Sequence, residues 1–505
     1  MTGAQRLIDQ TSQLAETLSA LHGAATRTRD FSQDKLKELT TMCQNTGPHS
    51  SLSRVQYSSY QDVRSCPRGI LVLPDELIYN VFKLLQEDDL HEKFHELIVF
   101  ASVTCRRLRA IVISTSSFWN KIYMHMHPDA IDAFLLRSGK ELLDIVSRND
   151  AELFSFEKVL QHRQRWRSLS LHYKFANMEM FQRVTARLTG LNLPNLCRLN
   201  LQFPDQNDNL NEEDVNESAH VYRSWVAPSL REASLYDTVP RFIHGFQLKK
   251  LFIEIELYGW IQTSDPLATL MSCLASQPML EDLTFIMLHF PLETEHSADD
   301  RVNLPLLRSL HLGVGDGLPH EDEDSDQDDT GTSFAVPAIL TRLITPVLES
   351  LHVGFVVTLE DSFTFEIDTI FPSERDYTTL RGLSLSIYET NAVDLETDFT
   401  LSPFSGIFEQ MPNLEELCLE IPDTRVQGID YGYGGPLPPL RCLKLYRCFE
   451  LNVNALRGVL QVFRGSPNWG KLKLNIESCP ELQGCTDALT DLLPPERIQI
   501  TDSKY

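Results

Sequence analysis

Leu440-Arg441-Cys442-Leu443-Lys444-Leu445-Tyr446-Arg447-Cys448 is the stretch of this 505-residue chain from which the fold can be read. Its leucines follow the spacing Leu-x-x-Leu-x-Leu. Successive side chains of a β-strand point to opposite faces, so Leu443 and Leu445 share one face and Lys444 lies on the other. The pattern predicts a short strand with one buried face, and Cys448 stands where a side chain can bond to the backbone of the following turn.

The same spacing recurs from Trp166 onward, mostly at intervals of about thirty residues. Helical apolar patterns at 267–274 and 451–462 place helices between such strands. Self-similarity of this length resembles a degenerate leucine-rich repeat, in which each unit buries its leucines against its neighbours. A non-repetitive α/β domain whose strands begin with the same motif is the alternative. About eleven copies are present; the better ones begin at Leu196, Leu307, Leu348, Leu414 and Leu440, and the poorer ones at Trp166, Leu230, Leu248, Leu280, Leu380 and Trp469.

A second informative region runs from Leu71 to Ile122. Pro74 suits the first turn of a helix, where its missing N–H costs nothing, and Asp75 and Glu76 favour the positive end of the helix dipole. Three short helices over about fifty residues have a marginal core, and their excess apolar surface indicates docking to another chain. The apolar residues recur at helical spacing in three runs: Leu77, Ile78, Val81, Phe82, Leu84 and Leu85; Phe94, Leu97, Ile98, Ala101 and Val103; and Leu108, Ile111 and Val112, which lead to Phe118 and Trp119.

The order of Leu73-Pro74, the helix, Cys105-Arg106-Arg107 and Phe118-Trp119 resembles an F-box, the helical motif that joins proteins to cullin-type ubiquitin ligases. Arg137-Ser138-Gly139 is similar to a segment that follows the box in the expanded F-box families of mushroom-forming fungi. A helical subdomain packed on its own protein is the alternative. The resemblance implies binding of a Skp-type adaptor through Leu73, Pro74, Leu77, Ile78, Val81, Phe82, Leu85, Leu97, Val103, Phe118 and Trp119.

These patterns predict an α/β chain in which an N-terminal helical F-box module precedes an irregular leucine-rich-repeat solenoid. The acidic run beginning at His320 cannot bury itself and is expected to be an inserted loop. The expected segments are 1–45, an N-terminal helix or short coiled coil; 46–69, a linker; 70–127, the F-box-like domain; 128–160, a connector; and 161–500, the repeats, with the acidic loop at 318–333.

Composition narrows the classes of partner. The chain has 70 acidic and 45 basic residues and a formal charge of −25, which disfavours nucleic acid and anionic membranes. No apolar run is long enough to span a bilayer. Ten cysteines are scattered without a C-x-x-C pair, which is typical of a reducing compartment. We therefore expect an intracellular protein of the cytoplasm or nucleus whose partners are proteins, without a cofactor.

His91-Glu92-Lys93-Phe94-His95 matches H-E-x-x-H, the zinc-protease motif in which two histidines one helical turn apart hold the metal. A longer metalloprotease pattern would need Gly at position 98 and His at position 101, where Ile98 and Ala101 stand. No third ligand is supplied downstream. A metal site is therefore not expected, and a zinc hydrolase is kept only as a remote alternative.

Between the two inward leucines of each repeat lies one residue on the opposite, concave face. That column reads Ser170, Asn200, Ser234, Phe252, Thr284, His311, His352, Ser384, Cys418, Lys444 and Lys473. Tyr446 and Lys471 join Lys444 and Lys473 in the last units, and the three lysines predict a local positive patch for an acidic or phosphorylated target segment. His311 and His352 are the next candidates for target binding.

The resemblance implies a non-catalytic subunit that recognises substrates of an SCF-type cullin–RING ubiquitin ligase. The box would bind the adaptor, and the repeats would hold a target protein near the ubiquitin-loaded enzyme. The alternative from the binding class is a leucine-rich-repeat scaffold that does not engage the ligase.

Overall fold

A computed structural model describes residues 73–87, 91–148, 153–172, 186–202, 221–237, 245–255, 266–287, 301–315, 335–357, 370–371, 377–389, 405–420, 436–448 and 451–501. The chain divides into two compact units, residues 1–82 and 83–505. The expected N-terminal helix at 1–45, the linker at 46–69 and the acidic loop at 318–333 lie outside the described residues. The unit boundary falls inside the first described helix rather than at residue 69.

Within the described residues, three helices and a short 3-10 turn precede the sheet: α3 (Asp75–Glu87), α4 (His91–Thr104), α5 (Arg106–Ser114) and η2 (Ser116–Trp119). Helix α3 begins where expected, because the Pro74 carbonyl accepts hydrogen bonds from the N–H groups of Leu77 and Ile78. Cys105 caps α5 through its Sγ, which accepts from the N–H of Leu108 at 3.4 Å.

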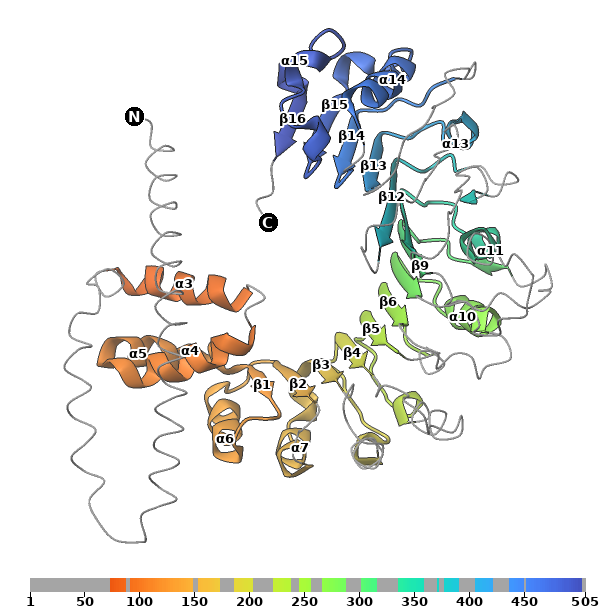
Figure 1. The fold of residues 1–505 in the computed structure, drawn as a ribbon. Coiled ribbons are helices and arrows are strands. Elements are labelled where there is room, and N and C mark those ends of the chain that lie inside the picture. Colours follow the sequence, from red (N-terminus) through yellow and green to blue (C-terminus); the bar gives the residue numbers. More distant parts are fainter. Residues whose placement is uncertain are drawn as a thin grey trace, which may run out of the picture. The chain divides into compact units, whose positions relative to one another are not determined.

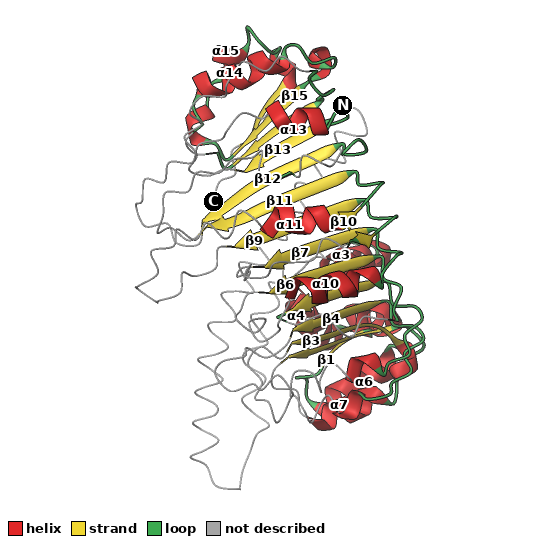
Figure 2. Cartoon of the chain, turned by 90° about the vertical axis from the view of Figure 1, so that its right-hand side faces the viewer, coloured by secondary structure: helices red, strands yellow, loops and turns green. Residues whose placement is uncertain are grey.

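The described residues of the second unit contain a sheet of fourteen strands, each hydrogen-bonded to its neighbour in the sheet, and the order in the sheet follows the sequence (Figures 1 and 2). Every pairing between these strands is parallel, as expected when a helix or loop returns behind each strand. The strands are β1 (Lys121–Tyr123), β2 (Leu143–Arg148), β3 (Trp166–His172), β4 (Arg198–Gln202), β5 (Glu232–Tyr236), β6 (Lys250–Ile255), β7 (Asp282–Met287), β9 (Ser309–Gly315), β11 (Ser350–Val357), β12 (Gly382–Glu389), β13 (Glu416–Glu420), β14 (Cys442–Tyr446), β15 (Lys473–Glu477) and β16 (Ile498–Thr501).

The described helices between strands lie against one face of this sheet (Figure 1). A two-stranded parallel sheet of β8 (Val302–Asn303) and β10 (Leu343–Ile344) lies apart from the large one. The helices are α6 (Pro128–Arg137), α7 (Leu153–Leu160), α10 (Pro266–Ala275), α11 (Ala335–Arg342), α13 (Ser405–Gln410), α14 (Val453–Phe463) and α15 (Thr486–Leu489), with 3-10 turns η3 (Arg163–Arg165), η6 (Trp469–Lys471), η7 (Pro480–Leu482) and η8 (Pro495–Arg497).

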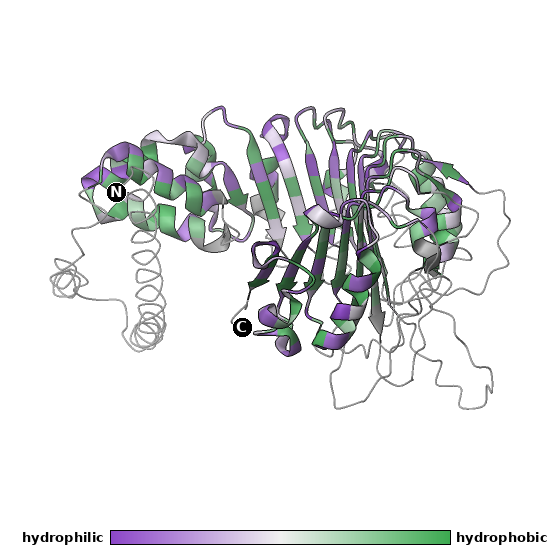
Figure 3. Ribbon diagram, turned by 90° about the horizontal axis from the view of Figure 1, so that it is seen from above, coloured by the Kyte–Doolittle hydropathy of each residue, from purple (hydrophilic) through white to green (hydrophobic). Residues whose placement is uncertain are grey.

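A column of aliphatic side chains holds the strands in register. Leu310, Leu351 and Leu383 face one another on consecutive strands and are buried, at 1%, 0% and 2% exposed. Residues two positions along, such as Leu312 and Val353, form a second buried column. Hydrophobic and hydrophilic residues alternate along the strands (Figure 3), which is the period-two pattern of a strand with only one buried face. The first column contains Ile122, Ile145, Leu169, Leu199, Ala233, Leu251, Leu283, Leu310, Leu351, Leu383, Leu417, Leu443, Leu474 and Ile498.

The predicted α/β class is correct, and each of the eleven Leu-x-x-Leu-x-Leu copies contains one strand between β3 and β15. Helices α10 and α14 occupy the two predicted helical intervals. The sheet is longer than expected at its N-terminal side, because β1 lies in the segment assigned to the box and β2 in the segment assigned to the connector. Both strands pair in parallel with their neighbours, and after an irregularity between Leu143 and Asp144 they keep the register of the following strands.

Trp119 joins the helical region to the start of the sheet. Its Nε1–H donates to the Val112 carbonyl oxygen at 2.8 Å, and its ring is 0% exposed. The ring packs edge-to-face on Phe134 of α6, with centroids 4.9 Å apart, and the Arg137 guanidinium lies 4.3 Å from the ring centre. Trp119 is therefore a core residue of the second unit.

Charged residues of alternating sign stand immediately before seven consecutive strands. In each case a backbone N–H donates to the carbonyl of the equivalent residue one strand earlier. Ion pairs join Lys249 Nζ to Glu281 (2.6 Å), Arg308 to Glu349 (3.4 Å) and Arg441 to Glu415 (3.1 Å). We call this row the charge ladder; it contains Lys249, Glu281, Arg308, Glu349, Arg381, Glu415 and Arg441.

Replacing Leu351 by Ala is expected to destabilise the fold by about 2–5 kcal/mol, because a cavity would open in the fully buried column. The free energy of unfolding is measured by urea denaturation. Leu306→Ala is the matched control, since Leu306 is 39% exposed, and its cost should stay within about 0.5 kcal/mol. Equal losses in the two variants would contradict the packing described here.

Candidate functional site

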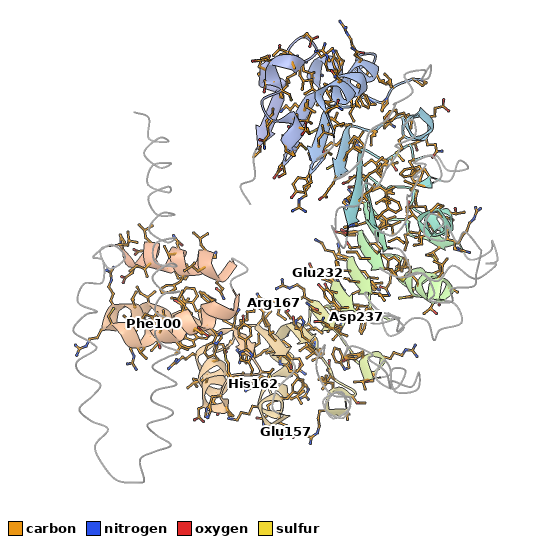
Figure 4. All side chains as sticks on the ribbon, in the orientation of Figure 1. Phe100, Glu157, His162, Arg167, Glu232 and Asp237 are labelled. Atoms are coloured by element: carbon orange, nitrogen blue, oxygen red, sulfur yellow. The ribbon has the colours of Figure 1, made fainter. Side chains whose placement is uncertain are left out.

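Helix α4 is apolar on both of its faces. Phe94, Ile98 and Ala101 are buried, and the Phe94 ring packs edge-to-face against Phe118 with centroids 6.0 Å apart. On the other face Phe100 and Val103 are 63% and 72% exposed (Phe100 is labelled in Figure 4). A surface helix of a globular protein normally presents polar residues there. The exposed apolar surface of α4 and α5 consists of Val99, Phe100, Val103 and Ile113.

The residues predicted to contact an adaptor fall into two groups. Pro74, Leu77 and Val103 are exposed, and Leu73, Leu85 and Leu97 are partly exposed. The others are buried in this chain and serve its own core, so they do not form a docking surface in this conformation: Ile78, Val81, Phe82, Phe118 and Trp119.

Sequence reasoning missed Val99, Phe100 and Ile113 as surface residues. The available signal was the run Leu97-Ile98-Val99-Phe100, in which four consecutive apolar residues cannot all face one core. Helical periodicity shows that such a run covers both sides of a helix, but it does not show which side faces the protein.

The H-E-x-x-H motif begins α4, and its His95 ring packs against Tyr123 and His125, with centroids 5.0 and 6.1 Å away. The side chains of His91 and Glu92 lie outside the described residues. Within the part of the chain that the structure describes, no three His, Cys, Asp or Glu side chains group as metal ligands would.

The second candidate surface is the face of the sheet opposite the described helices, here called the open face. Ten positions of the predicted column, from Ser170 to Lys444, are in register across consecutive strands. The last position is wrong: Lys473 pairs with Cys442, and Asn475 faces Lys444. Apolar and polar residues alternate through Leu472-Lys473-Leu474-Asn475-Ile476. The sequence therefore does not decide between two registers of this strand that differ by two residues.

On the open face, the paired positions of β9, β11 and β12 carry no acidic or basic side chain except the two histidines. The nine positions are small or neutral, and Gly313 lies against Ile286, where a Cβ would come within 3.2 Å of that side chain. Charged residues resume on the flanking strands, at Asp282 and Glu416. The neutral window contains Ser309, His311 and Gly313 on β9, Ser350, His352 and Gly354 on β11, and Gly382, Ser384 and Ser386 on β12.

His311 and His352 form the centre of this window. Their ring centroids are 4.0 Å apart and the rings are tilted by 59°. His352 Nε2 is 2.9 Å from the buried Ser386 hydroxyl, which orients the ring. Burial lowers the pKa of both imidazoles; the neighbouring His311 lowers the pKa of His352 further, to about 4, while Asp282 acts in the opposite direction on His311.

Phe252 on β6 and Tyr236 on β5, two and three strands away from His311, provide partly exposed aromatic rings on the same face, with centroids 5.2 Å apart. Half-buried aromatic side chains are the residues that most often anchor a protein partner. Together with the histidine pair they make the middle of the open face the part whose chemistry best suits contact with a protein partner.

The positive patch predicted near the C-terminus is not formed. Lys444 Nζ lies 3.1 Å from Glu416 Oε2, and this carboxylate raises the pKa of the ammonium. Glu420 pairs with Arg447 at 3.7 Å, and Glu477 lies opposite Tyr446. Lys471 belongs to the turn η6 rather than to a strand. Lys444, Tyr446 and Lys473 therefore share a surface of mixed charge.

Comparison with protein-family models and with curated proteins found no match. Within the described residues, no helix is long and apolar enough to cross a membrane.

The histidine pair predicts a pH-dependent stability. Because both folded-state pKa values lie below the ordinary value of 6.5, the unfolded chain binds more protons at mildly acidic pH. The pair's contribution is present above pH 6.5 and is lost as the pH falls toward about 4. The thermal midpoint of the wild type should therefore fall more steeply from pH 7 to pH 5 than that of His311→Gln with His352→Gln. His127→Gln, at an exposed position, is the control, and parallel curves for wild type and double variant would refute the assignment.

Proposed function

We propose that this chain is an F-box protein that recognises substrates of a cullin–RING ubiquitin ligase. In this proposal α3 to α5 form the box, the strands and helices from β3 onward are leucine-rich repeats, and catalysis lies in other subunits. The chain would contribute proximity and orientation of the target.

The observation that carries the proposal is the exposed apolar surface of α4 and α5. Each large apolar side chain that is left in water forgoes roughly 1.5–3 kcal/mol of burial, so a helix of this kind is stabilised by a partner. The box resemblance supports a Skp-type adaptor as that partner: Leu73-Pro74 precede α3, Cys105-Arg106-Arg107 begin α5, and Phe118-Trp119 end η2.

The parallel strands support the second part of the proposal. A leucine-rich repeat buries one side-chain column and leaves the opposite face of each strand for binding. The neutral window and the Tyr236–Phe252 pair provide that contact surface, and a target segment of low charge with aromatic or hydrogen-bonding side chains fits it best.

Adaptor binding is tested by co-expressing the full chain with a Skp-type adaptor and measuring retention in a pull-down. Phe100→Asp with Val103→Asp should reduce retention at least about tenfold, because two exposed apolar contacts would be replaced by charges. Leu136→Asp is the matched control, since Leu136 of α6 is 81% exposed and lies outside the box.

A wild-type chain that never retains the adaptor would leave a repeat scaffold without ligase engagement. Retention by wild type and double variant alike would reject α4 as the contact. Unchanged thermal midpoints in both variants would show that the substitutions act at the surface rather than on folding.

Target capture is tested by affinity purification with ligase turnover blocked, followed by mass spectrometry. Phe252→Asp with His311→Asp should lose the proteins captured by the wild type while retaining the adaptor, because charge would enter the neutral part of the open face. Lys444→Glu with Lys473→Glu, in the region of mixed charge, should keep them. The reverse result would move the target site to β14 and β15.

A further inference from the structure

Two cysteines meet beyond the C-terminal ends of adjacent strands. The last paired residues of β14 and β15 are Tyr446 and Glu477. Cys448 and Cys479 follow two residues after the end of each strand. Both intervening residues, Arg447 and Ser478, have left-handed backbones, with φ of 52° and 56°. Because the two turns are alike, the cysteines stay opposite each other after the strands end.

Hydrogen bonds show that the two residues are in contact. The Arg447 N–H still donates to the Glu477 carbonyl at 3.0 Å, and the Cys448 N–H donates to Cys479 Sγ at 3.3 Å. Neighbouring strands lie about 4.8 Å apart, which falls inside the Cα separation of about 4.4–6.8 Å that a disulfide accepts. A bond between the two sulfurs therefore requires little movement of the backbone.

The pKa of Cys479 is shifted in the opposite direction from those of four other cysteines of the repeats. A hydrogen bond from the Cys448 side chain lowers the pKa of the Cys479 thiol, and backbone donors add to this effect against the cost of burial. Burial raises the pKa of Cys273, Cys418, Cys442 and Cys485. The thiolate is the reactive form of cysteine, so Cys479 is the better nucleophile of the group.

We propose that Cys448 and Cys479 form a reversible disulfide when the protein meets hydrogen peroxide. The Cys479 thiolate attacks one peroxide oxygen, the O–O bond breaks, and a sulfenic acid and hydroxide form. Cys448 sulfur then attacks the Cys479 sulfur, the S–O bond breaks, and a second hydroxide leaves. The two thiol protons and two hydroxides make two waters, so one peroxide is reduced for each disulfide formed.

Burial determines the rate of this reaction. Cys448 and Cys479 are only 3% and 2% exposed, so peroxide reaches them when the end of the repeat region opens locally. Oxidation should therefore be slower than that of a partly exposed thiol such as Cys197. Once formed, the bond encloses α14 and η6 in a covalent loop and raises resistance to unfolding of these last strands.

The test uses the purified full chain treated with hydrogen peroxide, then unfolded, alkylated and digested without reductant. We expect a peptide pair that joins Cys448 to Cys479, lighter by two hydrogen atoms and separated by dithiothreitol. Cys442→Ser should give the same linked pair. Cys448→Ser should not, and its Cys479 should be trapped as a sulfenic acid by dimedone.

Three results would overturn the proposal. One is full alkylation of both thiols in the wild type after peroxide treatment and unfolding. The second is a Cys479–Cys485 link as the main product, since Cys485 is the other buried thiol near Cys479. The third is random pairing among all cysteines. The wild-type peptide map decides between these outcomes even if a serine variant folds poorly.

Discussion

The in-register parallel pairing of the strands is the constraint on which the rest of the structure depends. From β3 to β16 each strand is hydrogen-bonded to its neighbour without a change of register. Once the face of one residue in a strand is known, the faces of the residues paired with it on all other strands are known too. A shift by one residue would turn every leucine of that strand toward solvent. The buried columns around Leu351 prevent such a shift, and they also hold His311 beside His352.

The two candidate surfaces arise from opposite departures from ordinary surface chemistry. On α4 the departure is an excess of apolar area, where Phe100 and Val103 are more exposed than an isolated subunit would favour. On the open face it is the absence of formal charge within the neutral window of β9, β11 and β12, in a chain whose formal charge is −25. Both departures reduce the cost of desolvation when a protein partner binds.

The sequence was most informative about the strands. The Leu-x-x-Leu-x-Leu spacing, in which apolar and polar residues alternate, located all eleven strands from β3 to β15. It failed at β15, because Leu472, Leu474 and Ile476 alternate without a break and the register was decided by pairing with β14. β1 and β2 were missed as members of the sheet because their repeats lack the Leu-x-x-Leu spacing. Burial of Phe118 and Trp119 could not be foreseen, since an aromatic pair at the end of a helical region suits a core and a docking surface equally. The ion pair of Lys444 with Glu416 depends on residues that are 28 positions apart in the sequence.

The charge ladder from Lys249 to Arg441 restricts how the number of repeats can change. The sign of the charge alternates from each strand to the next. If one strand with its returning segment were lost or duplicated, two residues of like charge would stand on neighbouring strands, about 4.8 Å apart. Removal or insertion of two adjacent units preserves the alternation. Within this segment, changing the length by two units rather than one therefore avoids like-charge neighbours, a difference of at most about 1 kcal/mol for each exposed pair.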